Sequence, residues 1–97
     1  MIAGYDPKVA GGVRAQLERL DEILAFLADA PETEAVISAR EHLQSARSYL
    51  LGAMPVELEL SLAMAEAAIS DVDDHRLRQK ALHMLNDVRE ARATPMM

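Results

Sequence analysis

Apolar residues recur at alternating steps of three and four along four stretches of this chain, with Pro or Asp residues between the stretches. This spacing places each set on one side of an α-helix, so four apolar stripes must be buried against one another. We therefore expect an all-α fold, an antiparallel four-helix bundle with short connections marked by Pro or Asp. The stripes are Ala10, Val13, Leu17, Leu20, Leu24 and Leu27; Val36, Ala39, Leu43, Ala46, Leu50 and Ala53; Leu58, Leu62, Ala65, Ile69 and Val72; and Leu77, Ala81, Met84, Val88 and Ala91.

The chain of 97 residues is expected to form a single helical domain, 1–97. The predicted helices span residues 12–29, 32–52, 56–71 and 75–92. Residues 1–11 and 94–97 are expected to be irregular, although Asp6-Pro7 has the form of a helix start. Gly11-Gly12 follows within a turn, and each glycine disfavours a helix by about 1 kcal/mol relative to Ala. Gly52 is predicted to end the second helix.

The main core positions follow from the stripes. We expect these side chains to be mostly buried: Leu17, Leu20, Leu24, Leu27, Leu43, Leu50, Leu58, Leu62, Ile69, Leu77 and Val88.

The segment 56–64 alternates apolar and polar residues, which is also typical of a β-strand. No other strand is predicted to pair with it, and its Leu, Met, Glu and Ala residues favour a helix. The alternation therefore indicates a helix that is apolar on more than one side, with Leu60, Met64 and Ala68 on a second face. Exposed Leu60 and Met64 would leave an apolar patch in water, so we expect them at the interface of a homodimer.

The charge of the chain limits its partners. The formal net charge is −6 and the calculated pI is about 4.9, with five Lys or Arg against eight Asp or Glu in residues 1–48 and the same numbers in residues 49–97. A DNA-binding protein normally has a basic face, so no direct contact with nucleic acid is expected. No apolar run is long enough to span a membrane, and no signal peptide is apparent, so the expected location is the cytoplasm.

Asp71, Asp73 and Asp74 lie close together between the last two predicted helices. Carboxylates crowded into one turn can bind Ca²⁺ or Mg²⁺, but this turn lacks the Gly and the distal Glu of an EF-hand loop. Helix capping by Asp73 or Asp74 explains the same residues. We favour capping and expect no bound metal.

No motif for catalysis or for a cofactor is present. The chain has no Cys, no glycine pattern for a phosphate loop and no Ser or Thr in a nucleophile elbow. The residues three positions before His42, His75 and His83 are not Glu, so the Glu-x-x-His pattern of four-helix di-iron sites is absent. We therefore expect a protein that is not an enzyme and has no cofactor.

His42 is followed ten residues later by Gly52 in a predicted helix. This spacing is similar to that of the histidine-phosphotransfer domains, whose motif is His-x-x-Lys-Gly with a further Gly at the tenth position. Ser45 and Ala46 stand where that family has Lys and Gly, so Arg47 would have to supply the positive charge. The resemblance implies phosphoryl transfer through an exposed His42. The alternative interpretation, which we favour, is an ordinary surface histidine.

A longer stretch, residues 35–74, resembles the helical region that follows the GTPase domain in MnmE-type tRNA-modification proteins. The residues that carry the resemblance are Glu41-His42-Leu43-Gln44, Leu50-Leu51-Gly52-Ala53, Pro55, Glu57-Leu58 and Leu62. The chain has no P-loop, no GTPase domain and no terminal Cys-Ile-Gly-Lys sequence, so the resemblance implies a helical hairpin of similar shape and transfers no activity to any residue.

Taken together, these patterns predict a small non-catalytic helical protein that acts through protein–protein contacts in regulation or assembly. Two alternatives remain open: a histidine-phosphotransfer domain that uses His42, and a helical module associated with tRNA-modification machinery.

Overall fold

Four helices make up the described part of the chain, and this confirms the all-α class. The computed structural model describes the backbone of residues 7–92 and the side chains of residues 12–91. No β-strand occurs within residues 7–92, so the helical interpretation of residues 56–64 is confirmed. None of the helices in this range is both long and apolar enough to cross a bilayer. The helices are α1 (Pro7–Ala28), α2 (Glu34–Leu51), α3 (Pro55–Ser70) and α4 (His75–Arg92).

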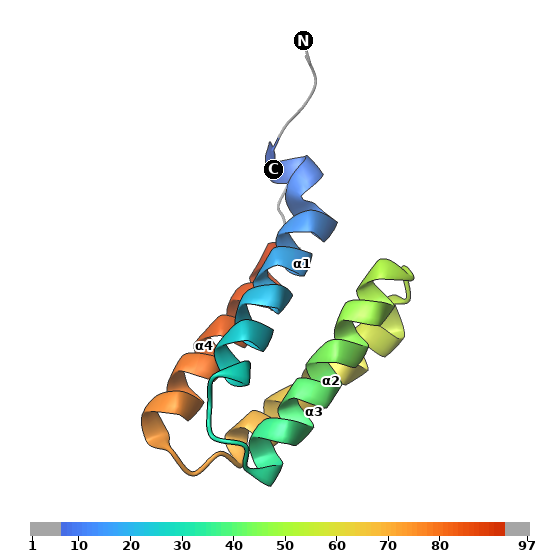
Figure 1. The fold of residues 1–97 in the computed structure, drawn as a ribbon. Coiled ribbons are helices and arrows are strands. Elements are labelled where there is room, and N and C mark those ends of the chain that lie inside the picture. Colours follow the sequence, from blue (N-terminus) through green and yellow to red (C-terminus); the bar gives the residue numbers. More distant parts are fainter. Residues whose placement is uncertain (1–6, 93–97) are drawn as a thin grey trace.

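The helices pack mainly in two pairs, α2 with α3 and α1 with α4 (Figure 1). Contacts between the pairs are fewer, and they join α1 to α2 and α3 to α4. The ribbons of the two pairs lie closest at the end that holds residues 29–33 and 71–74, and they diverge toward the opposite end (Figure 1). Each helix therefore has one main neighbour and one minor neighbour.

The first helix is longer than the sequence predicts, because it begins at Pro7 rather than at residue 12. Residues 7–11 were expected to be irregular and are helical. Proline suits the first helical position, since its fixed φ angle matches the helix and its missing N–H has no partner there. The glycines in the next turn weaken the helix but do not prevent it. Residues 1–6 and 94–97, also expected to be irregular, lie outside the described residues.

The core contains most of the predicted side chains. Leu20, Leu27, Leu43, Leu50, Leu58, Leu62, Ile69 and Val88 are buried as expected. Leu17, Leu24 and Leu77 are partly buried and pack against the edge of the core. Ile23 and Leu85, which were not predicted, are fully buried.

The buried stripe of α1 also includes a polar residue. Gln16 is 2% exposed, and its side-chain amide donates a hydrogen bond to the Val88 carbonyl of α4 at 3.1 Å. Gln16, Leu20, Ile23 and Leu27 follow the same three-and-four spacing as the predicted stripe, rotated slightly around the helix. This rotation turns α1 toward α4, its main neighbour.

Capping residues and a proline mark where α2 begins and ends and where α3 begins. The hydroxyl of Thr33 accepts a hydrogen bond from the Val36 amide at 3.3 Å, so α2 starts at Glu34 rather than directly after Pro31. Gly52 ends α2, as predicted, and Pro55 opens α3. The turn between α2 and α3 contains Ala53 with a φ of 56°, which is a left-handed conformation.

Candidate functional site

The side of α3 that points away from the core carries large apolar side chains in solvent. Val56 is 76% exposed, Leu60 60% and Met64 45%, and the nearby Ala63 and Ala67 on the same side are also exposed. We call these five residues the outer face of α3. Residues four apart lie on the same side of a helix, so Val56, Leu60 and Met64 form a continuous stripe.

The opposite side of α3 explains why this stripe is left in solvent. Leu58, Leu62, Ala65 and Ile69 are buried and fill the space against the other helices. Ala68, which the sequence analysis grouped with Leu60 and Met64, is also on this side and only 9% exposed, so that assignment is wrong. A helix at the rim of a four-helix protein can bury only one wide stripe, and here the second stripe has no partner among the described residues.

The turn before α3 adds to the exposed apolar surface. Leu51 is 57% exposed and Met54 is 42% exposed. Both lie within five residues of Val56 along the chain. The exposed apolar side chains in the described part of the chain are thus concentrated in residues 51–64, with Val13 and Ile37 as the other large ones.

The charged residues around the outer face of α3 are all acidic in the local sequence. From Ser48 to Asp74 the chain has six carboxylates and no Lys or Arg. One of these carboxylates, Glu66, forms an ion pair with Arg89 of α4 at 2.7 Å. Glu57 and Asp71 have no ion pair among the described residues. The outer face of α3 is therefore apolar, with the carboxylates of Glu57 and Asp71 beside it and no Lys or Arg in this stretch of the chain.

His42 and Arg47 lie on different sides of α2. Five residues correspond to a rotation of roughly 140° around a helix, so the two side chains do not point to the same place. The Nε of Arg47 donates to a carboxylate oxygen of Asp21 in α1 at 2.8 Å, and this hydrogen bond together with the charge of Asp21 raises the pKa of Arg47. Arg47 thus holds α2 to α1 at this point.

The surroundings of His42 also differ from those that phosphoryl transfer requires. His42 is partly buried, and Ala46, one turn later, is fully buried in the core. An incoming receiver domain needs small, exposed neighbours around the histidine. Of the two small residues suggested by the sequence, only Ser45 is exposed.

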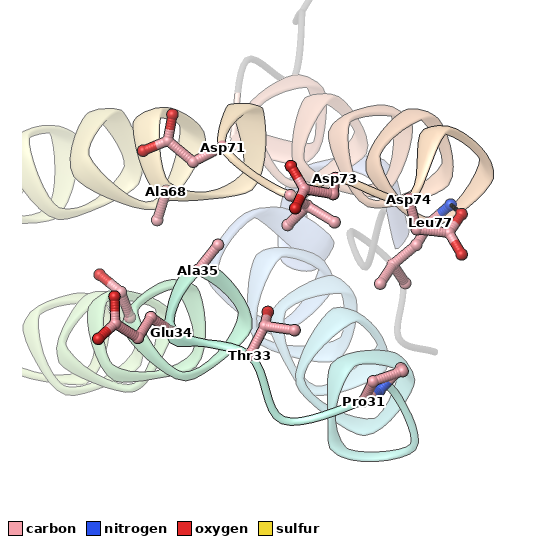
Figure 2. A pocket seen from close by; sticks show the side chains of 11 residues that line it. Pro31, Thr33, Glu34, Ala35, Ala68, Asp71, Asp73, Asp74 and Leu77 are labelled. Atoms are coloured by element: carbon pink, nitrogen blue, oxygen red, sulfur yellow. Dashed lines mark hydrogen bonds between the residues drawn. The ribbon is translucent and has the colours of Figure 1, made fainter.

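Two Asp residues of the acidic turn between α3 and α4 cap the adjacent helices. Asp74 accepts a hydrogen bond from the Leu77 amide at 3.0 Å, and Asp71 is the C-cap residue of α3. The carboxylates of Asp71, Asp73 and Asp74 point in different directions (Figure 2). Within the described residues, no group of three His, Cys, Asp or Glu side chains is arranged to hold a metal ion.

The same turn lines a shallow hollow of about 660 Å³ at the end of the molecule where the two helix pairs meet. Its other wall is formed by the connection between α1 and α2 and by the start of α2, where Thr33 and Glu34 lie (Figure 2). Apolar atoms of Val72 and Leu77 form part of the lining. The hollow is lined by the three Asp residues of the α3–α4 connection and by Glu34 at the start of α2, and no Lys or Arg is among its lining residues.

Sequence reasoning identified Leu60 and Met64 but not the rest of the outer face. Val56, Ala63 and Ala67 were not predicted to belong to it, because Ala and Val side chains contribute much less to the apolar pattern than the Leu residues of α3. Their spacing from Leu60 in steps of three and four was the signal that could have revealed them.

The chain matches no protein-family model, no curated protein and no solved structure.

Proposed function

We propose that this chain is a small non-catalytic helical protein that acts through protein–protein contacts in a regulatory or assembly role. The observation that carries the proposal is the exposure of Val56, Leu60 and Met64 on one side of α3. Contiguous apolar surface of this kind on a small protein marks an interaction site, because leaving it in water is unfavourable. A cytoplasmic location and a lack of direct contact with nucleic acid, both expected from the sequence, belong to the same proposal.

Self-association through the outer face of α3 is the simplest form of this proposal. Two copies related by a twofold axis would bury Leu60 and Met64 of each protomer against the same residues of its partner. The exposed alanines in the stripe support close packing, since they allow the two helices to approach.

Light scattering after size-exclusion chromatography tests this form. The parent should be a dimer at low micromolar concentration, and Leu60→Glu with Met64→Glu should be a monomer with unchanged helix content. Val13→Glu with Ile37→Glu adds the same two charges at exposed apolar positions outside α3. This control should remain a dimer. A parent that stays monomeric at hundredfold higher concentration would refute self-association.

The antiparallel bundle predicted from the sequence is also part of the proposal. Two observations support it: the connections between helices are only three to five residues long, and among the described residues α1 does not pack on α3 nor α2 on α4. Short connections favour antiparallel neighbours, and diagonal helices of a bundle rarely touch.

The alternative functions have less support. Phosphoryl transfer through His42 would need a free cation nearby, whereas Arg47 is paired with Asp21. A role beside tRNA-modification machinery depends on the resemblance of residues 35–74, and no geometric feature adds to it. Incubating the protein with a phosphorylated receiver domain, or purifying it with its bound partners, would distinguish these alternatives from the main proposal.

A further inference from the structure

We infer that the outer face of α3 binds a basic amphipathic helix of another protein. This inference rests on the proposed function, because it uses the same surface, but it does not require self-association. Helices of this kind bind in apolar grooves or on apolar faces through side chains spaced three and four residues apart, and basic flanking residues add specificity when the surface is acidic.

The order of residues along the face supports a charged partner. Glu57, Leu60, Met64, Ala67 and Asp71 follow one another at steps of three, four, three and four, which places them on one side of α3. The row from Glu57 to Asp71 thus has a carboxylate at each end and apolar residues between, and Val56 lies next to Glu57 at its start. Glu57 is half-buried and Asp71 is exposed, and neither has an ion pair among the described residues.

A second copy is a poorer match to this order of residues. In a twofold arrangement centred on Met64, Glu57 of one protomer faces Asp71 of its partner, and the same happens at the other end. Like charges in contact disfavour association. No cation between Ser48 and Asp74 is available to offset this repulsion.

A basic partner helix avoids this repulsion between carboxylates. The stripe from Glu57 to Asp71 spans 15 residues, or about 21 Å at 1.5 Å a residue, so a partner helix of about four turns covers it. Such a helix places apolar side chains on Leu60 and Met64 and one Lys or Arg at each end, against Glu57 and Asp71. Ala63 and Ala67 leave room for a large apolar side chain of the partner.

Fluorescence anisotropy with two synthetic peptides tests the inference. The peptides share Leu at positions spaced three and four apart, and one carries Lys and the other Glu at every flanking position. The parent should bind the Lys peptide and not the Glu peptide. Leu60→Ser with Met64→Ser should abolish binding, whereas the Val13→Ser control should not affect it.

Charge-matched variants separate the stripe from a general attraction to an acidic protein. Glu57→Gln with Asp71→Asn should weaken binding of the Lys peptide about three- to tenfold, the loss expected for two exposed ion pairs. Glu34→Gln with Asp73→Asn removes the same net charge elsewhere and should leave the affinity unchanged. Equal loss in both variants would overturn the inference, as would equal binding of the two peptides.

Light scattering on the same samples keeps the two proposals apart. Glu57→Gln with Asp71→Asn should strengthen self-association while it weakens binding of the Lys peptide. A dimer that binds no Lys peptide overturns this inference and leaves the proposed homodimer standing. A monomer that binds the Lys peptide through Leu60 and Met64 supports this inference and refutes only the homodimer.

Discussion

At the scale of single residues, the turn between α2 and α3 places its glycine one position away from where a glycine is needed. Gly52 has a φ of −87°, which any residue adopts, whereas Ala53 has a φ of 56°. The left-handed region is unfavourable for a residue with a Cβ atom and is usually filled by glycine at this point after a helix. The sequence correctly predicts that α2 ends at Gly52, but it does not reveal which residue adopts the left-handed conformation.

Ala53→Gly should therefore stabilise the protein by about 0.5–1 kcal/mol, because it removes the unfavourable contacts of the Cβ atom at positive φ. Gly52→Ala should change stability by less than about 0.5 kcal/mol. Its added Cβ would lie 3.4 Å from the Ser48 carbonyl oxygen, which is an ordinary contact. Urea unfolding of both variants measures the difference. Destabilisation by Ala53→Gly would contradict the argument.

Gln16 shows what a pattern of apolar residues misses at this scale. A glutamine in a helix is expected to face solvent, and here it is buried because its amide finds the Val88 carbonyl of α4. The two residues are 72 positions apart. No local pattern contains that information, since it depends on which helix becomes the neighbour of α1.

At the scale of helices, α1 contains two apolar stripes that overlap. Leu20 and Leu27 belong to both, but one stripe includes Leu24 and the other Ile23. The spacing of the sequence is compatible with either, so the helix and its approximate span were predictable and its rotation was not. In the structure Ile23 is fully buried and Leu24 only partly, so the stripe that includes Ile23 is the one that faces the core.

Ile23→Ala should lower the free energy of unfolding by about 2–5 kcal/mol, because it leaves a cavity in the core. Leu24→Ala at the neighbouring position should cost less than half as much, since Leu24 is partly exposed and its loss opens no closed cavity. Chemical denaturation gives both values. If the two variants are equally destabilised, the rotation of α1 described above is wrong.

A substitution near the start of α1 is expected to stabilise the protein. A Cβ atom added to Gly12 would meet no atom within 4 Å, and the residue lies inside a helix. Gly12→Ala should therefore stabilise the protein by about 1 kcal/mol and raise its melting temperature by about 4–8 °C. Thermal unfolding followed by circular dichroism tests this. An unchanged melting temperature would mean that the first turns of α1 contribute little to the cooperative fold.

At the scale of the whole molecule, the number and order of the helices follow from the sequence, but their partners do not. Apolar periodicity, the positions of Pro31, Gly52 and Pro55, and the Asp residues at 71–74 were sufficient to locate the connections. The unequal pairing of α1 with α4 and α2 with α3 depends on how side-chain volumes fit across the core. The candidate site was partly predictable, because Leu60 and Met64 are large apolar residues that do not belong to the buried stripe of α3.

The proposed antiparallel direction of α2 and α3 gives a distance prediction. The chain has no Cys, so pairs of introduced cysteines carry spin labels at defined positions. Labels at Glu34 and Ser70 should be close, whereas labels at Glu34 and Val56 should be separated by roughly the length of α2, about 27 Å at 1.5 Å a residue. Double electron–electron resonance spectroscopy measures both distances. The reverse order of distances would rule out the antiparallel arrangement.

The pairing of α1 with α4 has a consequence for how the chain is made. The 46 residues from 29 to 74 are synthesised after α1 and before α4. During that time the buried face of α1, with Ile23 and Leu27, lacks α4, its main neighbour, whereas α2 and α3 meet their partner after only a three-residue turn. Exposed apolar stripes on a nascent helix are what chaperones bind and what leads to aggregation. On the ribosome, α1 is therefore the helix of this fold that depends most on protection until synthesis has passed residue 92.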